Sequence, residues 1–306
     1  MDILSLGEPL LEFNQLTEAG RQLYLPGFGG DTSNVAVAAA RQGARVGYCT
    51  RIGNDTFGDM FMDLWAAEGI DTSQVARDGS APTGIYFVTH SEAGHAFSYF
   101  RAGSAASLMQ PEELSKQAIA GVKVLHLSGI SQAISDSACD TAFEAIQVAR
   151  EHGVKVSYDT NLRLKLWPRA RAKAIIMATV AHCDICMPSW DDANALTGLS
   201  DHDAIIDAFL ERGAGSVALK LGADGVVVAD ASARHRIAGH EVASVDATGA
   251  GDTFDGALLA ELVAGVALPE AAVYANAAAA LSTQGHGAVG PIPRRAAVEA
   301  FLAGQA

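Results

Sequence analysis

The sequence predicts an α/β protein in which helices cover both faces of a mostly parallel β-sheet. Along the 306 residues, short apolar runs rich in β-branched residues alternate with helical segments, an order typical of parallel strands joined by crossover helices. Hydrophobic residues make up 49% of the chain and charged residues 18%, so a folded core is expected rather than disorder. Residues 83–101 interrupt the alternation with two strand-like runs around SEAG, the pattern of a hairpin. We therefore expect one α/β domain over residues 1–306 with a small β appendage.

The N-terminal third begins the alternation. Strands are expected at residues 2–6 and 45–50, and helices at 32–42 and 60–68. The first of these helices has three adjacent candidates for its N-cap, which are Asp31, Thr32 and Ser33.

Four short segments predict a second, separate sheet. Residues 10–13 and 22–25 are apolar runs with polar residues between them, and they are compatible with a hairpin. Residues 83–90 and 95–101 form the interrupting hairpin. We expect the two hairpins, roughly residues 10–25 and 83–101, to lie together.

After residue 101 the alternation of strands and helices resumes. Further strands are expected at residues 122–127, 154–158, 184–187, 216–220, 225–229 and 234–237. Further helices are expected at residues 135–151, 168–181, 191–196, 204–212, 251–264, 269–283 and 293–302.

Charge and composition exclude several kinds of partner. The net charge of −14 argues against nucleic acid, which requires a basic face. No apolar run approaches the length of a membrane span, and the N-terminus lacks the features of a signal peptide. Four cysteines in such a chain suggest reduced thiols, so a cytoplasmic protein is expected. An anionic ligand would have to be bound by locally placed Arg, Lys or backbone amides.

The stretch DATGAGDTFDGA, residues 246–257, is the strongest chemical signal in the chain. Gly249, Ala250 and Gly251 precede an apolar helical run, and the unpaired amides of a helix start attract negative charge. Asp252 is a carboxylate within that turn, where it would repel a phosphate. If the reaction moves a phosphoryl group onto a hydroxyl, Asp252 could take the hydroxyl proton. An ordinary helix start with an acidic first turn would have the same sequence, so both interpretations stand at this point.

Other unusual residues follow predicted strands. Open α/β sheets bind ligands beyond the carboxyl ends of their strands. DTNLR ends at Arg163, which could clamp a carboxylate or phosphate, although an exposed polar loop is the alternative. Arg101 follows Tyr99 at the end of a hairpin strand, where a surface role is the alternative. KLGADG, residues 220–225, could wrap a nucleotide or simply connect two strands.

Two motifs together resemble the ribokinase-like (PfkB) carbohydrate kinases. Residues 246–257 resemble the C-terminal signature of that family, and GGDTSNVA (29–36) with RIGNDTFG (51–58) resembles its N-terminal signature. The resemblance spans essentially the whole chain. It implies a Rossmann-like core with a β lid, ATP as phosphoryl donor and a requirement for Mg²⁺. The hairpins match the lid in position.

Within the family, the chain is similar to the bacterial 2-keto-3-deoxygluconate kinase subfamily. The resemblance rests on GIYF (84–87), YFRAGSAAS (99–107) and DTNLR (159–163). It implies a sugar acid whose C6 hydroxyl is phosphorylated, with arginines addressing its carboxylate. The family motif N-x-x-E departs here to Ser189-Trp-Asp-Asp192, which weakens the transfer of a Mg²⁺ role to Asp192.

The resemblance also implies roles for individual residues. The catalytic set is Asp252 with the amides of Gly249, Ala250 and Gly251. The substrate set is Gly30, Asn34, Tyr86, Tyr99, Arg101, Arg163 and Asp252. The ATP set is Asn161, Arg163, Ser189, Lys220, Gly222, Asp224, Gly225, Gly249, Ala250, Gly251 and Asn276. The metal set is Asp192 for Mg²⁺, with Asp246 and Thr248 for a monovalent cation such as K⁺.

Alternatives remain open for the activity. A fructokinase or another sugar kinase of the same family is one, because fructokinases also carry an Arg near that lid strand. A non-catalytic sugar or nucleotide sensor on the same fold is another, although a sensor has no use for Asp252. Exposed edges of a lid sheet often pair, so we expect a homo-oligomer formed through the lid.

Overall fold

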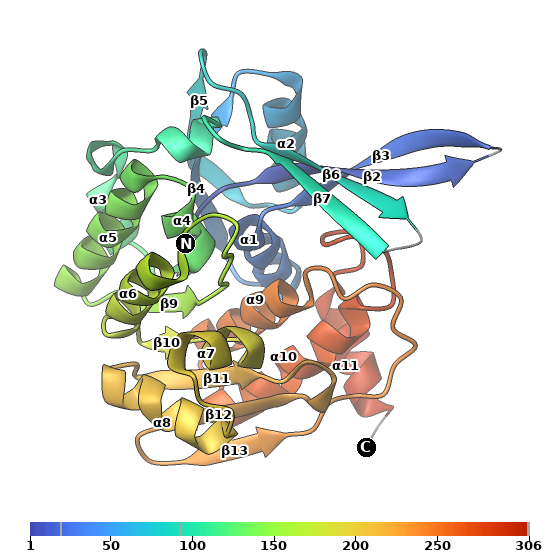
Figure 1. Ribbon diagram of the computed structural model, residues 1–306. Helices are drawn as coiled ribbons and strands as arrows, with labels where there is room; N and C mark the ends of the chain where they lie inside the picture. Colours follow the sequence, from blue (N-terminus) through green and yellow to red (C-terminus); the bar gives the residue numbers. More distant parts are fainter. Residues whose placement is uncertain (19, 92–93, 305–306) are drawn as a thin grey trace.

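The computed structural model describes residues 1–18, 20–91 and 94–304, and its main element is a nine-stranded, mostly parallel sheet (Figure 1). The strand order is β13-β12-β11-β10-β9-β8-β1-β4-β5, and every neighbouring pair from β11 to β5 is parallel. The antiparallel strands β12 and β13 complete one edge. The strands are β1 Ile3–Leu6, β4 Val46–Gly53, β5 Asp71–Asp78, β8 Val124–Ser128, β9 Lys155–Asp159, β10 Ile185–Cys186, β11 Ser216–Lys220, β12 Val226–Asp230 and β13 Arg234–Ile237. This is the α/β architecture that the alternation of segments predicts.

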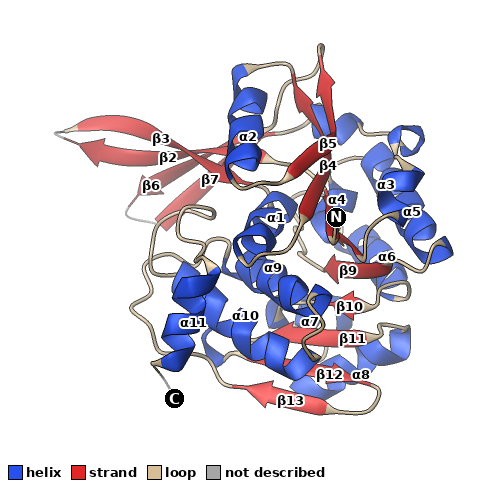
Figure 2. Cartoon of the chain, turned by 180° about the vertical axis from the view of Figure 1, so that it is seen from behind, coloured by secondary structure: helices blue, strands red, loops and turns tan. Residues whose placement is uncertain are grey.

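Helices cover both faces of this sheet, and each face has its own apolar cluster (Figures 1 and 2). The α-helices are α1 Asp31–Arg41, α2 Thr56–Ala67, α3 Lys116–Ala120, α4 Gly129–Ala133, α5 Asp136–Glu151, α6 Arg169–Val180, α7 Trp190–Thr197, α8 His202–Arg212, α9 Ala250–Val263, α10 Leu268–Ser282 and α11 Arg295–Ala303. Three short 3₁₀ turns are η1 Ala105–Leu108, η2 Pro111–Glu113 and η3 Gly222–Asp224. Helices α1, α2, α9, α10 and α11 contribute to one cluster, and α5 to α8 contribute to the other. Central strands such as β1 and β8 are buried throughout because both of their faces are covered.

A second sheet of four strands projects from the core (Figure 1). Its order is β3-β2-β6-β7, with β2 parallel to β6 and the other pairs antiparallel. The strands are β2 Leu10–Glu18, β3 Arg21–Gly29, β6 Ile85–Ser91 and β7 Gly94–Phe100. The turn predicted around residues 92–93 lies outside the described residues. The four strands place Tyr86 and Tyr99 opposite each other on adjacent strands, with stacked rings 5.5 Å apart.

Some expectations for individual elements were wrong. None of Asp31, Thr32 or Ser33 caps helix α1: the N-cap is Gly30, with φ 93° and no side-chain cap hydrogen bond. A β-carbon at Gly30 would collide with the carbonyl oxygen of Glu8, so the chain crossing there requires glycine.

The edges of both sheets also differ from the expectation. Strand β5 was not predicted, because its polar sequence DTSQVARD lacks the alternation of a half-buried strand and lies at a sheet edge. Strands β2 and β3 are each nine residues long and include the polar residues that seemed to separate two short runs. Across the described part of the chain, no helix combines the length and apolar character needed to cross a membrane.

Candidate active site

A cavity of about 2100 Å³ lies at the carboxyl ends of the central strands and is bordered by the four-stranded sheet. Single-ligand pockets typically measure about 300–1000 Å³, so this cavity has room for two ligands side by side. Every residue proposed from the sequence for the site lines it except Asp246. The residues that do so are Gly30, Asn34, Tyr86, Tyr99, Arg101, Asn161, Arg163, Ser189, Asp192, Lys220, Gly222, Asp224, Gly225, Thr248, Gly249, Ala250, Gly251, Asp252 and Asn276.

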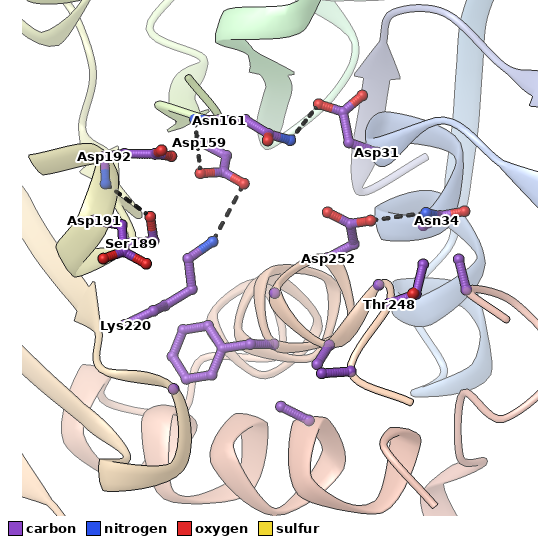
Figure 3. Close-up of a pocket in the computed structure, with 18 of the residues that line it drawn as sticks. Asp31, Asn34, Asp159, Asn161, Ser189, Asp191, Asp192, Lys220, Thr248 and Asp252 are labelled. Carbon is purple, nitrogen blue, oxygen red and sulfur yellow. Dashed lines mark hydrogen bonds and ion pairs between the residues drawn. The ribbon is translucent and has the colours of Figure 1, made fainter. Parts of the chain in front are cut away.

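Asp252 lies in the first turn of α9 and faces the start of α1 (Figure 3). The Asn34 side-chain amide donates a hydrogen bond of 2.7 Å to Asp252 Oδ2. Burial and the nearby charge of Asp31 raise the pKa of Asp252 to about 7, against the opposing effect of the Asn34 bond. A carboxylate with such a pKa can accept a proton near neutral pH and release it again.

The glycines before Asp252 differ in why they are glycine. Gly249 has φ 74°, and a β-carbon there would lie 2.9 Å from the Ala288 carbonyl oxygen. A β-carbon on Gly251 would meet only Lys220 Nζ, at 3.6 Å. Backbone conformation and protein packing therefore explain Gly249 but not Gly251. The missing side chain at Gly251 leaves open space beside the helix start.

The predicted set of amide donors is only partly free. The Ala250 amide donates to the Ala247 carbonyl oxygen at 3.1 Å and closes the turn before α9. Gly251 and Asp252 are in the first turn of the helix, where backbone N–H groups have no partner within the helix. An anion at this end would thus be met by these two amides and by the positive end of the helix dipole.

Lys220 places its ammonium group among carboxylates rather than at the cavity rim (Figure 3). Its Nζ lies 3.0 Å from both carboxylate oxygens of Asp255 and 3.2 Å from Asp159 Oδ2. Despite burial, these two carboxylates raise the pKa of Lys220, so the ammonium stays protonated. Asp255 is 0% exposed and lies one helical turn from Asp252. The ammonium group near Gly251 is therefore protonated but paired with two carboxylates of the protein.

Asp31 and Asn161 join the two halves of the cavity wall (Figure 3). Asn161 Nδ2 donates to Asp31 Oδ2 at 2.8 Å, and Asp31 Oδ1 is buried without a hydrogen-bond partner among the described residues. Asn161 adopts φ 30°, which is unusual for a residue other than glycine. Burial raises the pKa of Asp31. Strained backbone of this kind is often found at functional sites.

Ser189 and Asp192 mark the start of α7. Ser189 Oγ accepts a hydrogen bond from the Asp192 amide at 3.1 Å, so Ser189 acts as the N-cap. Asp192 Oδ2 accepts from the Leu162 amide at 3.1 Å. Burial and the charge of Asp159 raise the pKa of Asp192. Asp159 and Asp192 are thus two neighbouring carboxylates facing the cavity.

The two arginines predicted to bind substrate have different surroundings. Arg163 is exposed at the cavity, donates to the Leu162 carbonyl oxygen at 3.0 Å, and forms no ion pair with any described residue. Arg101 is largely buried, and its Nη2 donates to Glu8. Its guanidinium carbon lies 5.8 Å from the centre of the Tyr99 ring. The Tyr86 hydroxyl donates to Glu12.

The remaining predicted residues have mostly structural contacts. Asn276 Nδ2 donates to the Ala238 carbonyl oxygen at 2.8 Å. Asp246 lies outside the cavity lining, and its carboxylate accepts from the Thr248 amide, the Thr248 hydroxyl and the Gly287 amide at 2.6–2.9 Å. These bonds lower its pKa although partial burial opposes the shift.

Sequence reasoning assigned no role in binding or catalysis to five acidic residues in or beside the cavity. These are Glu8, Glu12, Asp31, Asp159 and Asp255. Asp159 ends strand β9 and Glu8 lies just after strand β1, which was a usable signal for the carboxyl-end edge of the sheet. Asp255 is three residues after Asp252, so helical spacing puts the two carboxylates near one face.

Comparison with known proteins identifies the class. A sequence profile described as pfkB family carbohydrate kinase matches residues 14–295. The chain is 33% identical to a 2-dehydro-3-deoxygluconokinase of Thermoproteus tenax, over 97% of this chain and 93% of the relative. It is 32% identical to fructokinase-2 of Solanum habrochaites, over 99% of this chain and 97% of that relative. A crystal structure from E. coli, described as a ribokinase II in complex with ATP and Mg²⁺, superposes with a TM-score of 0.90 at 26% identity, covering 99% of both chains.

These matches and the site define a phosphotransferase that acts on carbohydrate hydroxyls. The chain belongs to the PfkB family of carbohydrate kinases. The resemblance read from the two glycine motifs is thereby confirmed at the level of the family and of the fold.

Proposed function

We propose that this protein transfers the γ-phosphoryl group of ATP to the C6 hydroxyl of 2-keto-3-deoxygluconate, giving the 6-phosphate. The observation that carries the proposal for a sugar acid is the state of Arg163. This guanidinium faces the cavity and has no acidic partner among the described residues. Because arginine is always charged, it is available to pair with a carboxylate or phosphate of a ligand. The similarity to a 2-dehydro-3-deoxygluconokinase supports the same substrate.

The reaction needs a base, a donor site and a way to hold developing charge. The substrate hydroxyl oxygen attacks the γ-phosphorus, the bond from that phosphorus to the bridging oxygen breaks, and ADP leaves. Asp252 takes the hydroxyl proton. The hydrogen bond from Asn34 holds the Asp252 carboxylate toward the substrate. The amides of Gly251 and Asp252 face the phosphoryl group, with the Lys220 ammonium beside them. Fixed dipoles and charges at this position stabilise the transition state more than the ground state.

The four-stranded sheet serves as a lid in this proposal. Tyr86, Tyr99 and Arg101 would cover the sugar from above, and closure would exclude water that could hydrolyse ATP. Residues 220–225 and Asn276 would border the nucleotide on the opposite side. We infer one domain with this sheet as its mobile part.

The residues present fit a nucleotide-bound Mg²⁺. No group of three or more His, Cys, Asp or Glu suited to a metal was found in the portion that the structure describes. Mg²⁺ bound with a nucleotide uses only one or two carboxylates, with phosphate oxygens and waters completing its coordination. Asp159 and Asp192, both at the cavity, would hold it there. When bound, Mg²⁺ supplies neutralisation of the phosphate charge. Asp246 and Thr248 bond to each other within their own loop, so these oxygens are taken up by contacts within the chain rather than offered to K⁺.

A fructokinase is the second candidate. The similarity to fructokinase-2 favours it. The pairing of Arg101 with Glu8 also favours it, because this pair offsets one of the two arginine charges at the cavity. A neutral sugar requires no free positive charge.

A substrate panel separates the candidates. ADP release would be measured with 2-keto-3-deoxygluconate, its galactonate epimer, fructose and ribose, and ³¹P NMR would locate the phosphate on the product. We expect turnover of the keto acid with phosphate at C6. Strong turnover of fructose with none of the keto acid would contradict the proposal. Binding of ATP and sugar without any turnover would instead indicate a sensor.

A further inference from the structure

Two buried glutamates lie where the four-stranded sheet joins the core. Glu8 is 1% exposed and lies between β1 and β2, and Glu12 is 5% exposed on β2. Each holds a residue that lines the cavity: Glu8 accepts from Arg101, and Glu12 accepts from the Tyr86 hydroxyl. Neither glutamate has a part in the proposed phosphoryl transfer. Their position suggests that they control the groups that meet the sugar.

The contacts of Glu8 fix its carboxylate in one place. Ser104 Oγ donates to Glu8 Oε1 at 2.7 Å, while Glu8 Oε2 accepts from Arg101. A β-carbon on Gly84 would lie 2.9 Å from Glu8 Oε1, so a glycine just before β6 lets the carboxylate pack closely there. Arg101 and Ser104 both follow strand β7, and Glu8 therefore binds the end of that strand to the core.

Arg101 in turn lines the cavity, with its guanidinium held by Glu8. Its side chain is 10% exposed, and its Nε is buried without a hydrogen-bond partner among residues that the structure describes. An unpaired buried donor is costly, and a ligand oxygen would satisfy it. Burial raises the pKa of Glu8, while the Arg101 charge and the Ser104 hydrogen bond favour its ionised form. As an anion, Glu8 reduces the charge that a ligand meets at Arg101.

We propose that Glu8 is a positioning residue that sets the preference between sugar acids and neutral sugars. It orients the Arg101 guanidinium and cancels part of its charge. With Glu8 charged, Arg101 can bind the hydroxyl groups of a neutral sugar as well as the carboxylate of a sugar acid. Without that charge, the pocket favours the acid more strongly. The inference assumes the sugar site of the proposed function but does not depend on which sugar the protein naturally phosphorylates.

The test is the ratio of dissociation constants for 2-keto-3-deoxygluconate and fructose, measured by calorimetry in the presence of a non-hydrolysable ATP analogue. In Glu8→Gln, affinity for the acid relative to affinity for fructose is expected to rise by about three- to ten-fold. This is the size of the effect of one partly screened charge. Glu12→Gln is the matched control: it removes another buried carboxylate where the four-stranded sheet joins the core, but one that pairs with an uncharged phenol. It is expected to change the ratio less than two-fold, as a rough bound.

A second pair of variants separates positioning from folding. Replacing one partner of a buried ion pair can destabilise the fold, whereas replacing both often does not. Arg101→Met leaves the Glu8 charge without its partner, so affinity for the acid relative to fructose should fall in this variant. The double variant Glu8→Gln/Arg101→Met removes that charge as well and should recover the acid relative to Arg101→Met. Glu8→Asp keeps the charge and should keep the wild-type ratio while weakening both ligands.

The outcomes are distinct. An unchanged ratio in Glu8→Gln with weaker binding of both ligands would mean a purely structural role and would overturn the inference. So would an equal shift with Glu12→Gln, or equal ratios in Arg101→Met and the double variant. If Glu8→Gln does not fold, the comparison of the double variant with Arg101→Met decides. Failure of the proposed substrate shows itself separately, as wild-type protein that binds the keto acid without phosphorylating it.

Discussion

Asn34 and Asp252 are 218 positions apart in sequence, yet the Asn34 amide donates a 2.7 Å hydrogen bond to the Asp252 carboxylate. The bond joins the first turns of α1 and α9, whose starts both face the cavity. It therefore connects the N-terminal and C-terminal glycine motifs at the proposed point of phosphoryl transfer.

Removal of the base should stop the chemistry but not the binding. Asp252→Asn is expected to lower kcat by at least about 10²-fold, the usual lower bound for losing a general base, with sugar and nucleotide binding largely kept. ADP release and calorimetry measure the two quantities. Asp63→Asn, the same change at an exposed position of α2, is the control. A variant at Asp252 that keeps its turnover would remove this residue from the mechanism.

The rate should depend on pH through Asp252. Its pKa is raised to about 7, and only the ionised form can take a proton, so kcat/KM should fall as pH drops through about 7. The Asn34 bond favours the ionised form, so Asn34→Ala should move this acidic limb to higher pH. Profiles of kcat/KM from pH 5.5 to 9, measured on the wild type and on Asn34→Ala, would show this shift of the acidic limb. A limb at the same pH in both proteins would argue that another group titrates.

Gly249→Ala should reduce the stability of the protein, whereas Gly251→Ala should reduce its activity. At Gly249 a side chain meets Ala288 and an unfavourable φ, so the variant should lose about 1–3 kcal/mol of unfolding free energy. At Gly251 the protein has room, so stability should be unchanged while kcat/KM falls by about 10²-fold because the methyl group displaces the phosphoryl group. Thermal unfolding and kinetics on both variants test this contrast. Full activity of Gly251→Ala would show that no ligand occupies that space.

Arg163 should matter more for an acid than for a neutral sugar. Arg163→Met is expected to reduce kcat/KM for 2-keto-3-deoxygluconate by about 10-fold or more, as for loss of a charged hydrogen bond, and to affect fructose less. Arg171→Met removes a surface arginine that pairs with Asp136 and serves as the control. Equal losses on both sugars would place Arg163 at the ATP phosphates instead.

The four-stranded sheet should pair with a second copy of the chain. Large apolar side chains are exposed on it, among them Leu16, Leu25 and Phe100, which is 63% exposed. A second copy would bury them and would cover the free strand edges. Sedimentation analysis is expected to show a dimer, and Leu25→Glu with Phe100→Glu to give a monomer. A monomeric wild-type protein would contradict the prediction.

The sequence by itself determined the class of fold and the position of the chemistry. Alternation of apolar strands with helices is a local pattern, and it was enough to predict the parallel sheet with helices on both faces. The order Gly249-Ala250-Gly251-Asp252 needs only a helix start to place a carboxylate beside free amides. What local patterns could not reach was strand β5, whose pairing depends on the sheet edge rather than on its own residues.

Only the tertiary structure decided which charges remain available to a ligand. The sequence offers Arg101, Arg163 and Lys220 as candidates for binding a ligand. Folding brings Glu8 to Arg101 and Asp255 to Lys220, and leaves Arg163 without an acidic partner in the described part of the chain. Glu8 and Arg101 lie 93 positions apart, and Asp255 and Lys220 lie 35 apart. Pairings over such separations follow from how strands and helices pack, which no short stretch of sequence encodes.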